Sequence, residues 1–516
     1  MRPKFMRSIL LLLLALPVVS ASSAPRELSE NQKVTHVLNR LGYGPRPGDV
    51  ARVEGMGIRQ YIEQQLHPEQ ISDTATESRL AMFPSIHMNS GELLERYPQP
   101  KQAARQAGLQ KPKAGNNLKA DRAQLQNVMQ QNGQQKPQLM LQELESQKII
   151  RAVYSDRQLQ EVMADFWFNH FNVYWKKGQD KWLTTNYEMN AIRPHVMGKF
   201  KDLLMATAKS PAMLFYLDNH LSSAPNNAPA LKAAAAARQV NPKNPLAPLI
   251  QARTAAAANA NKGKARNAGI NENYGRELME LHTMGVDGGY TQKDVQEVAR
   301  AFTGWTIDMP RQNAEFTFRP AMHDRGEKVV LGNTIRAGGG IEDGERVIDI
   351  LAHHPSTARF ISTKLVHYFV SDNPPQSLID KVAATYMKTD GDIREMLRTI
   401  FYSEEFMSPD AYQGKTKSAL EYVVSAIRAV NGETNGGPRL AQLLGKMGQP
   451  LYQFVAPTGF PDRADYWLSD GSLVERINFA VTLTLNKIPD TRVQLTTFRD
   501  PNSAALYLGS PEFQKR

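Results

Sequence analysis

The strongest constraint on the fold of this chain is the helical spacing of its apolar residues, which recurs along most of its length. In residues 31–41, valine and leucine fall on one face of a helix that stops at Gly42. The same spacing predicts helices over residues 141–154, 157–172, 198–208, 272–284, 292–302, 344–353, 357–370, 392–402 and 415–430. The clear β signal is limited to two short runs near 316–332 that flank turn-forming residues. We therefore predict a mainly α, large multi-helix single globular domain with one small β-hairpin.

Composition separates this helical core from two other kinds of segment. Residues 99–139 are rich in Gln and Lys, and residues 222–268 are rich in Ala, Asn and Pro. Both have few residues that could form a core, which is typical of flexible insertions or solvated extra helices. The core itself is expected at residues 25–98, 140–221 and 269–490, followed by a C-terminal tail at 491–516.

The first residues have the pattern of an export signal. A cationic start precedes an apolar run from Ile9 to Val19, and small residues after it offer cleavage behind Ala21 or Ala24. The run is too short for a membrane span, which needs about 20 apolar residues; an uncleaved anchor is the alternative. We predict a signal peptide at residues 1–24 and an exported protein, periplasmic or extracellular, with no transmembrane segment after cleavage.

Composition also excludes several classes of function. Cysteine is absent, which rules out disulfide scaffolds, cysteine nucleophiles, Cys-ligated zinc and iron–sulfur clusters. The formal net charge is +11, but the basic excess lies mainly in residues 1–24, 100–139 and 222–268. The last two contain no Phe, Trp or Tyr, whereas single-stranded nucleic acid is bound by basic grooves with aromatic rings. Nucleic acid is therefore not expected as a partner.

The helix predicted over residues 272–284 places two carboxylates on one stripe beside its apolar face. At 100° per residue, Asn273, Glu277 and Glu280 fall within about 60° of one another. Crowded carboxylates suit acid–base catalysis or cation binding, because crowding drives their pKa values apart. The alternative is structural, with Arg276 paired to Glu280 one turn away and Glu277 solvated.

Two histidine motifs combine an imidazole with other polar groups. Asn169 and His170 follow Trp167 in an aromatic segment and must be hydrogen-bonded, either to a ligand or to the protein's own backbone. In the predicted hairpin turn, Asp324 could orient His323 for proton transfer, or both could be ordinary turn residues. Each motif thus has a functional and a structural interpretation.

A basic stripe is predicted on the helix over residues 357–370. Arg359, Thr363 and His367 line one side of it, and Lys364 lies between them and the apolar face. This stripe could pair with the two carboxylates of the acidic stripe, either as part of a site or as part of the structure.

Sequence motifs for metals, nucleophiles and phosphates are missing. The chain has no His-Glu-x-x-His, no Gly-x-Ser-x-Gly and no Gly-x4-Gly-Lys-Ser/Thr. We therefore expect no cofactor and no dedicated metal ligands. A calcium or magnesium ion at Glu277 and Glu280 is the weaker alternative, since both ions prefer oxygen ligands.

Six segments occur in order over about residues 30–490 and carry a resemblance to a known family. They are HVLNRLGYGPRPGDV, FWFNHFNV, NENYGRELMELHTMGVDGGYTQKDVQEVARAFTGW, HDRGEKVVLG, HPSTARFISTKLVHYFVSDNPP and TGFPDRADYWLSDGSLVERINFA. Through them the chain resembles the bacterial exported family catalogued as domain of unknown function number 1800. The resemblance implies a mainly helical exported protein, often encoded beside a second uncharacterised family, and implies no particular activity. The family's polar motif residues correspond to Asn169, His170, Asn273, Arg276, Glu277, Glu280, His282, His323, Asp324, Lys364 and Arg476.

The first functional hypothesis is an exported hydrolase or lyase that acts on an envelope or environmental polymer such as a carbohydrate. Glu277 and Glu280 would be the acid–base pair, and His170 or His323, the latter beside Asp324, would carry protons. The residues expected to bind the substrate are Asn169, Asn273, Arg276, Lys364 and Trp167.

The alternative hypothesis is a non-catalytic exported protein that binds or assembles a partner protein. Its polar motifs would then form a buried network that holds the helices together. The two hypotheses differ in geometry. An enzyme predicts that the candidate residues meet at an open pocket, and a scaffold predicts that they are scattered or sealed by hydrogen bonds.

Overall fold

A computed structural model describes residues 27–99, 102–104, 118–224, 269–308 and 314–516. The predicted signal peptide, residues 100–101 and 105–117 of the first predicted insertion and residues 225–268 of the second lie outside these residues. The described part is a single globular fold made of helices and three two-stranded sheets, which confirms the mainly α prediction. No helix in this part of the chain is long and apolar enough to cross a membrane.

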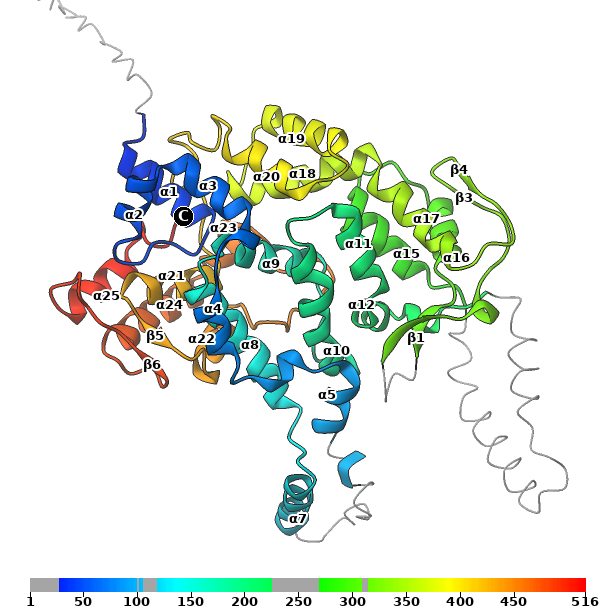
Figure 1. Ribbon diagram of the computed structural model, residues 1–516, viewed down its shortest axis with the longest axis horizontal. Helices are drawn as coiled ribbons and strands as arrows, with labels where there is room; N and C mark the ends of the chain where they lie inside the picture. Colours follow the sequence, from blue (N-terminus) through cyan, green and yellow to red (C-terminus); the bar gives the residue numbers. More distant parts are fainter. Residues whose placement is uncertain (1–26, 100–101, 105–117, 225–268, 309–313) are drawn as a thin grey trace, which may run out of the picture.

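The helices are arranged in groups along the long axis of the molecule (Figure 1). One end combines the beginning and the end of the described chain, namely α1 (Glu30–Arg40), α2 (Asp49–Met56), α3 (Ile58–Leu66), α21 (Ala419–Ala429), α22 (Pro438–Lys446), α24 (Asp470–Thr484) and α25 (Pro501–Gly509). The centre contains α4 (Thr74–Leu80), α5 (Ser90–Arg96), α8 (Gln138–Tyr154), α9 (Gln158–His170) and α10 (Asp180–Asn186). Helix α7 (Leu118–Gln131) lies apart from this body.

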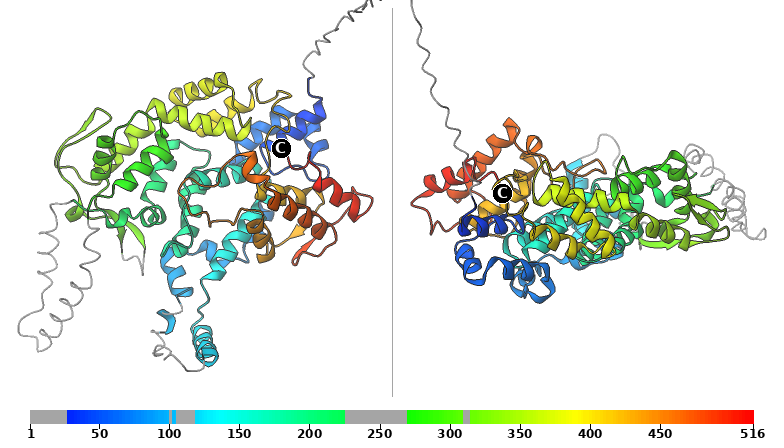
Figure 2. Two further views of the ribbon diagram at one scale, coloured as in Figure 1. Left: turned by 180° about the vertical axis from the view of Figure 1, so that it is seen from behind. Right: turned by 90° about the horizontal axis from the view of Figure 1, so that it is seen from above.

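The remaining helices form one edge and the other end of the molecule, as the view from behind in Figure 2 also shows. The edge consists of α18 (Pro355–Phe369), α19 (Gln376–Lys388) and α20 (Ile393–Phe401). The other end consists of α11 (Phe200–Lys209), α12 (Pro211–Tyr216), α15 (Glu272–Met279), α16 (Gln292–Ala301), α17 (Ile341–Ala352) and two β-hairpins.

Local sequence signals explain where many of these helices begin. The side chains of Ser29, Thr291 and Ser418 each accept a hydrogen bond from a backbone N–H three residues later. The side chain of that later residue accepts a hydrogen bond from the backbone N–H of the capping residue. These reciprocal bonds are capping boxes, which satisfy backbone donors that a helix leaves unpaired. Every helix predicted from apolar spacing is present. The one predicted over 272–284 is α15 followed by the π-helix η8 (Glu280–Met284).

The β-structure corrects the prediction of a single hairpin. The observed antiparallel pairs are β1 (Trp305–Asp308) with β2 (Glu315–Phe318), β3 (Lys328–Val330) with β4 (Asn333–Ile335), and β5 (Glu433–Thr434) with β6 (Thr491–Arg492). The two runs predicted to pair with each other thus belong to separate hairpins. The reason lies at Leu331 and Gly332, whose φ values of 49° and 77° form the tight two-residue turn that folds β3 back on the next residues.

A continuous apolar core joins these groups of helices. Trp167, which the sequence analysis proposes as a substrate-binding residue, has no exposed surface and belongs to this core. Its indole N–H donates a hydrogen bond to the Val196 carbonyl oxygen at 3.2 Å. The indole polar group is therefore satisfied by the protein's own backbone.

The last residues, described above as a C-terminal tail, pack on the body. Strand β6 pairs with β5, α25 packs against α24, and Lys515 forms a β-bridge with Thr416. Arg516 is buried, and its guanidinium lies 2.9 Å from the Glu421 carboxylate.

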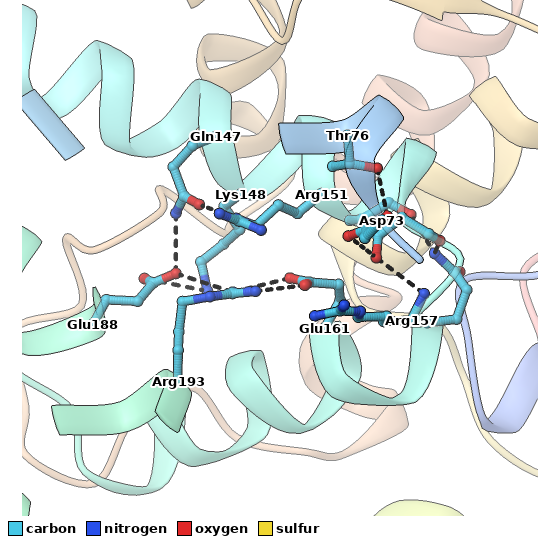
Figure 3. Close-up of polar contacts among 12 residues, drawn as sticks. Asp73, Thr76, Gln147, Lys148, Arg151, Arg157, Glu161, Glu188 and Arg193 are labelled. Atoms are coloured by element: carbon cyan, nitrogen blue, oxygen red, sulfur yellow. Dashed lines mark hydrogen bonds and ion pairs between the residues drawn. The ribbon is translucent and has the colours of Figure 1, made fainter. Parts of the chain in front are cut away.

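A buried ionic network connects α8, α9 and the π-helix η3 (Tyr187–Ile192) in the centre of the molecule (Figure 3). Arg193 donates to both carboxylate oxygens of Glu161, at 2.9 and 2.5 Å. Glu188 has no exposed side-chain surface and lies 3.8 Å from Lys148 and 3.9 Å from Arg193. Gln147 donates to Glu188 at 3.0 Å. The network thus balances acidic and basic groups inside the core.

Candidate functional site

Four segments that are far apart in sequence line one pocket of about 340 Å³. They are the end of α9, the second half of α18, the start of α21 and the loop from residue 449 to the short helix α23 (Ala464–Trp467). Three of the predicted site residues meet here, namely Asn169, His170 and Lys364.

Helical spacing explains why α9 and α18 both contribute polar side chains to the pocket. Residues four positions apart lie on the same face of a helix. The pairs that line the pocket in this way are Asp165 with Asn169, Phe166 with His170, Thr363 with His367, and Lys364 with Tyr368.

Asn169 holds the loop that forms the outer wall of the pocket. Its amide donates to the Phe460 carbonyl oxygen at 2.9 Å and accepts from the Phe460 N–H at 2.7 Å. The adjacent Gly459 has a φ of 69°, and a Cβ atom there would lie only 2.1 Å from the main-chain carbonyl oxygen of Asn169. Only glycine fits this contact without displacement. Through its two hydrogen bonds with Phe460, Asn169 bonds to the protein's own backbone, which is one of the two alternatives predicted for it.

The carboxylates that line the pocket all have basic partners. Asp165 lies 2.9 Å from Lys148, Glu421 lies 2.9 Å from Arg516, and Asp462 lies 3.0 Å from Lys415. Burial by itself would raise the pKa of Asp462, but the hydrogen bond with His367 and the Lys415 charge outweigh burial and lower it to about 2. Asp462 is therefore ionised at neutral pH.

Lys364 is the cation of the pocket that lacks a counter-charge. It is partly exposed, and no described residue forms a hydrogen bond or an ion pair with it. Its ammonium group lies 5.5 Å from the centre of the Phe360 ring. Burial lowers the pKa of Lys364 to about 8, although the Asp462 charge acts in the opposite direction. Lys364 is thus mostly protonated at pH 7 and has room for an anionic ligand.

His170 is a buried neutral imidazole in the wall of the pocket. Its Nε2 lies 3.1 Å from the His282 carbonyl oxygen, and since a carbonyl only accepts, Nε2 donates and Nδ1 keeps its lone pair. This Nδ1 has no hydrogen-bond partner among the described residues. Burial and the nearby Lys364 charge hold the pKa of His170 well below its ordinary value. His170 can therefore accept a hydrogen bond but does not carry a positive charge.

His367 is the histidine of the pocket that a carboxylate orients. Its Nδ1 lies 3.1 Å from Asp462 Oδ2, and its Nε2 lies 3.9 Å from Asp372 Oδ1. Because ionised Asp462 can only accept, Nδ1–H donates to it. A histidine held by a carboxylate in this way is suited to proton transfer. The basic stripe does not pair with Glu277 and Glu280 as suggested above, because His367 faces Asp462.

The predicted acidic stripe lies outside this pocket. Its residues, on α15 and η8, are Asn273, Arg276, Glu277 and Glu280. Arg276 donates to Gln292 at 2.6 Å, and Glu280 accepts from the Tyr290 hydroxyl at 3.2 Å. The predicted Arg276–Glu280 pair is therefore wrong, because both side chains turn to partners outside their own helix. Burial and the Glu280 charge raise the pKa of Glu277, so the predicted crowding effect is present at Glu277.

His323 and Asp324 lie in a buried network behind the hairpins. His323 Nδ1 lies 2.8 Å from the Thr303 carbonyl oxygen, and its Nε2 lies 3.1 Å from Asp343. Asp324 accepts two hydrogen bonds from Arg300, at 3.0 and 3.1 Å. These contacts support the structural interpretation of the motif, since the groups are engaged within the protein.

The carboxylates of the pocket and the contact of His367 with Asp462 were not predicted from the sequence. Asp462 stands in the Thr-Gly-Phe-Pro-Asp-Arg segment, where an acid after proline is typical of a turn. The signal that could have identified it is the neighbouring Gly459, since a glycine beside aromatic and polar residues often marks close approach of another segment. Within the described ranges, no group of three or more His, Asp or Glu side chains could hold a metal ion.

Comparisons with known proteins identify one family. No curated protein and no solved structure matches this chain significantly. A family model with the description "Protein of unknown function (DUF1800)" matches residues 36–514. This range contains all the residues that line the pocket. Because the match covers nearly the whole sequence, the chain belongs to the DUF1800 family.

Proposed function

We propose that the pocket binds an anionic group and that the protein is a hydrolase or lyase acting on an acidic polymer. The observation that carries this proposal is the partly buried, unpaired Lys364 in a pocket whose carboxylates are all neutralised. A desolvated charge without a partner costs stability. Such a charge is typical of a site where a ligand provides the opposite charge.

The other pocket residues supply the chemistry that such a reaction needs. His367, oriented by Asp462, would exchange a proton with the substrate, either at a leaving oxygen in hydrolysis or at a carbon next to a carboxylate in elimination. His170 would line the pocket as a neutral, buried imidazole. The rings of Phe460 and Trp467 line the same pocket and would pack against the flat face of a sugar ring.

We further propose that the protein acts after export, at the cell envelope or outside the cell, as its first residues suggest. Acidic polysaccharides with uronic acid units are the substrate class that fits both this location and an anion-binding pocket. Glu277 and Glu280 would have at most an indirect part in this reaction, because they do not line the pocket.

A non-catalytic binding or assembly protein is the second candidate function, and two observations favour it. Glu277, Glu280, His323 and Asp324 lie outside the pocket, as expected for a protein whose polar motifs are scattered or sealed. The outer face of α24 exposes Val474, Ile477 and Val481 by 57%, 53% and 44%, and Leu506 on the neighbouring α25 is 77% exposed. Exposed apolar patches often mark protein interaction sites. Incubation with an acidic polysaccharide separates the two functions, because an enzyme shortens the polymer and a binding protein does not.

Replacing Lys364 by methionine is expected to weaken anion binding strongly without destabilising the fold. Binding of tetragalacturonate, measured by calorimetry at pH 7, should weaken at least about thirtyfold, because a desolvated charged contact is worth about 2 kcal/mol or more. The free energy of unfolding should stay equal or rise by about 1–3 kcal/mol, since methionine removes a poorly solvated charge and partial exposure limits the gain.

The matched control is Lys293→Met, which changes an exposed lysine on α16 and should leave binding unchanged. If Lys364→Met binds tetragalacturonate as tightly as the wild type, Lys364 is not the anion site and the proposal fails. Product analysis completes the test. A lyase forms unsaturated ends that absorb in the ultraviolet, and a hydrolase forms reducing ends without this absorbance. If no product of either kind forms, catalysis on this polymer is refuted.

Anion binding is also expected to depend on pH in a defined direction. The pKa of Lys364 is about 8, so its charge is present below pH 8 and lost above it. The Kd for tetragalacturonate should therefore be flat near pH 6–7 and rise about tenfold per pH unit above pH 8, as expected for one required proton. Lys364→Arg should bind with a flat profile to pH 10, because arginine stays charged. A wild-type profile that is equally flat would contradict the assignment.

A further inference from the structure

A second pocket, of about 370 Å³, shares no lining residue with the first. It lies where the start of α5, the end of α10, the π-helix η3, the start of α12 and strand β2 come together. Its polar lining consists of three amides, two hydroxyls and two charged residues, namely Asn89, Asn186, Asn190, Ser90, Ser210, Lys209 and Glu315. The composition of this pocket therefore differs from that of the charged pocket described above.

The amides of the second pocket form a chain of hydrogen bonds with a fixed direction. Asn190 donates to the Asn186 side-chain oxygen at 3.0 Å. Asn186 in turn donates to the Met88 carbonyl oxygen and to the Ser90 hydroxyl oxygen, each at 3.2 Å. Asn89 uses its side-chain oxygen to cap α5 by accepting from the Glu92 N–H at 3.0 Å. These bonds hold the amides in place before any ligand arrives.

This chain of hydrogen bonds leaves some donors and acceptors of the pocket available for a ligand. No described residue bonds to the Asn89 side-chain nitrogen Nδ2 or to the Asn190 side-chain oxygen, although the Asn89 backbone N–H donates to Glu92. The Ser90 hydroxyl accepts from Asn186 and can still donate its own proton. One pocket wall thus offers both donors and acceptors at neighbouring positions, which is the pattern that pairs of hydroxyl groups require.

The charges at this pocket argue against an anionic ligand, because Lys209 is already paired with a carboxylate and Glu315 is an exposed acid without an ion pair among the described residues. The Lys209 ammonium lies 2.6 Å from Glu345 and 5.9 Å from the centre of the Phe316 ring. Phe316 lies in an edge-to-face contact with Trp305, with ring centres 5.3 Å apart. Lys209 and Trp305 therefore hold an aromatic ring in the lining of the pocket that also contains the amides. A flat ring of this kind packs well against the C–H face of a sugar.

We infer that this second pocket binds a neutral polyhydroxylated ligand, namely a pyranose ring of an uncharged oligosaccharide. The amide chain would bind the hydroxyl groups, and Phe316 would cover the apolar face of the ring. The inference rests on the geometry of the second pocket alone. It can therefore be correct or wrong whether or not Lys364 binds an anion.

Calorimetric titration with cellotetraose, maltotetraose and chitotetraose tests this inference. At least one of the three neutral tetrasaccharides is expected to bind the wild type with a Kd on the order of 0.1–1 mM, typical of a few hydrogen bonds and one ring contact. Asn190→Ala should raise this Kd about fivefold to tenfold through the loss of hydrogen bonds, and Phe316→Ala should raise it by at least as much. Both side chains are at least partly exposed, so neither change should unfold the protein.

Asn502→Ala is the matched control, because Asn502 is an exposed asparagine at the start of α25, and it should leave the Kd unchanged. The inference is overturned if none of the tetrasaccharides binds the wild type. It is also overturned if binding survives both Asn190→Ala and Phe316→Ala, or if Lys364→Met abolishes the binding while Asn190→Ala retains it. The last result would place the neutral sugar in the first pocket.

Discussion

Arg193→Met is expected to lower the free energy of unfolding by about 3–5 kcal/mol, the usual cost of removing one partner from a buried ion pair. Arg193 donates two hydrogen bonds to Glu161, whose side chain is 5% exposed, and lies 3.9 Å from the fully buried Glu188 (Figure 3). In the variant, the carboxylates of Glu161 and Glu188 stay in the core without the positive charge of Arg193. Chemical denaturation monitored by circular dichroism measures the loss.

Two further variants show whether the loss comes from an unpaired buried charge. The double variant Arg193→Met, Glu161→Met removes both partners and should recover most of the loss, because burying two apolar side chains is close to neutral. Arg359→Met removes an ion pair with Asp380 in which both side chains are more than half exposed, and should cost less than about 1 kcal/mol. A double variant as unstable as Arg193→Met would mean that packing, and not charge, dominates at this position.

The same network should respond to acid in a defined direction. Burial raises the pKa of Glu161, but the charges of Arg193 and Arg151 and the hydrogen bonds outweigh burial, so its pKa lies below the ordinary value. A carboxylate of this kind stabilises the fold above the pKa that it has in the unfolded chain. Its contribution is lost as pH falls below about 4, and the wild type should lose more stability there than the double variant.

Gly459→Ala is expected to disrupt the pocket and to destabilise the protein by about 3 kcal/mol or more. The new Cβ atom would lie 2.1 Å from the Asn169 carbonyl oxygen, and the φ of 69° is itself unfavourable for alanine. The loop can only relieve this overlap by moving away from α9, which breaks the paired hydrogen bonds between Asn169 and Phe460. Because the loop carries Asp462 and Trp467, tetragalacturonate binding should weaken at least about tenfold.

Gly471→Ala is the matched control for this effect. Gly471 lies in the first turn of α24, and a Cβ atom there would meet no other atom within 4 Å. Alanine should therefore leave binding unchanged and stabilise the helix by a few tenths of a kcal/mol to about 1 kcal/mol. If Gly459→Ala were as stable as Gly471→Ala and bound the anion normally, the close contact with Asn169 would have no functional importance.

The helices could be predicted from sequence because their signals are local. Apolar spacing and capping residues such as Ser418 and Thr291 act within a few positions, so each helix appears close to its predicted range. Strand pairing depends on contacts between segments, and the tight turn at Leu331 and Gly332 decided it. The prediction of a single hairpin failed because Leu331-Gly332 was not recognised as a two-residue turn.

The candidate site could be predicted only in part, for a related physical reason. Asn169, His170 and Lys364 were identified because polar residues on an otherwise apolar helix face are visible in the sequence. The acidic stripe with Glu277 was equally visible, but helical spacing shows which residues share a face and not what that face meets. Asp462 was missed because its position depends on a loop that Asn169 holds from a distant part of the chain. The candidate residues therefore divide between the pocket, contacts in the interior and the partly exposed acidic stripe.

The bond between Asn169 and Phe460 also has a consequence for how the protein folds. These partners are 291 positions apart, so closing this contact requires a very long loop and raises the contact order of the fold. Helices α8 and α9 can form early during synthesis, but the pocket can assemble only after the ribosome has made the last of its four walls. Chains that stop short of this loop would fold helices without forming the pocket, so such fragments should not bind tetragalacturonate.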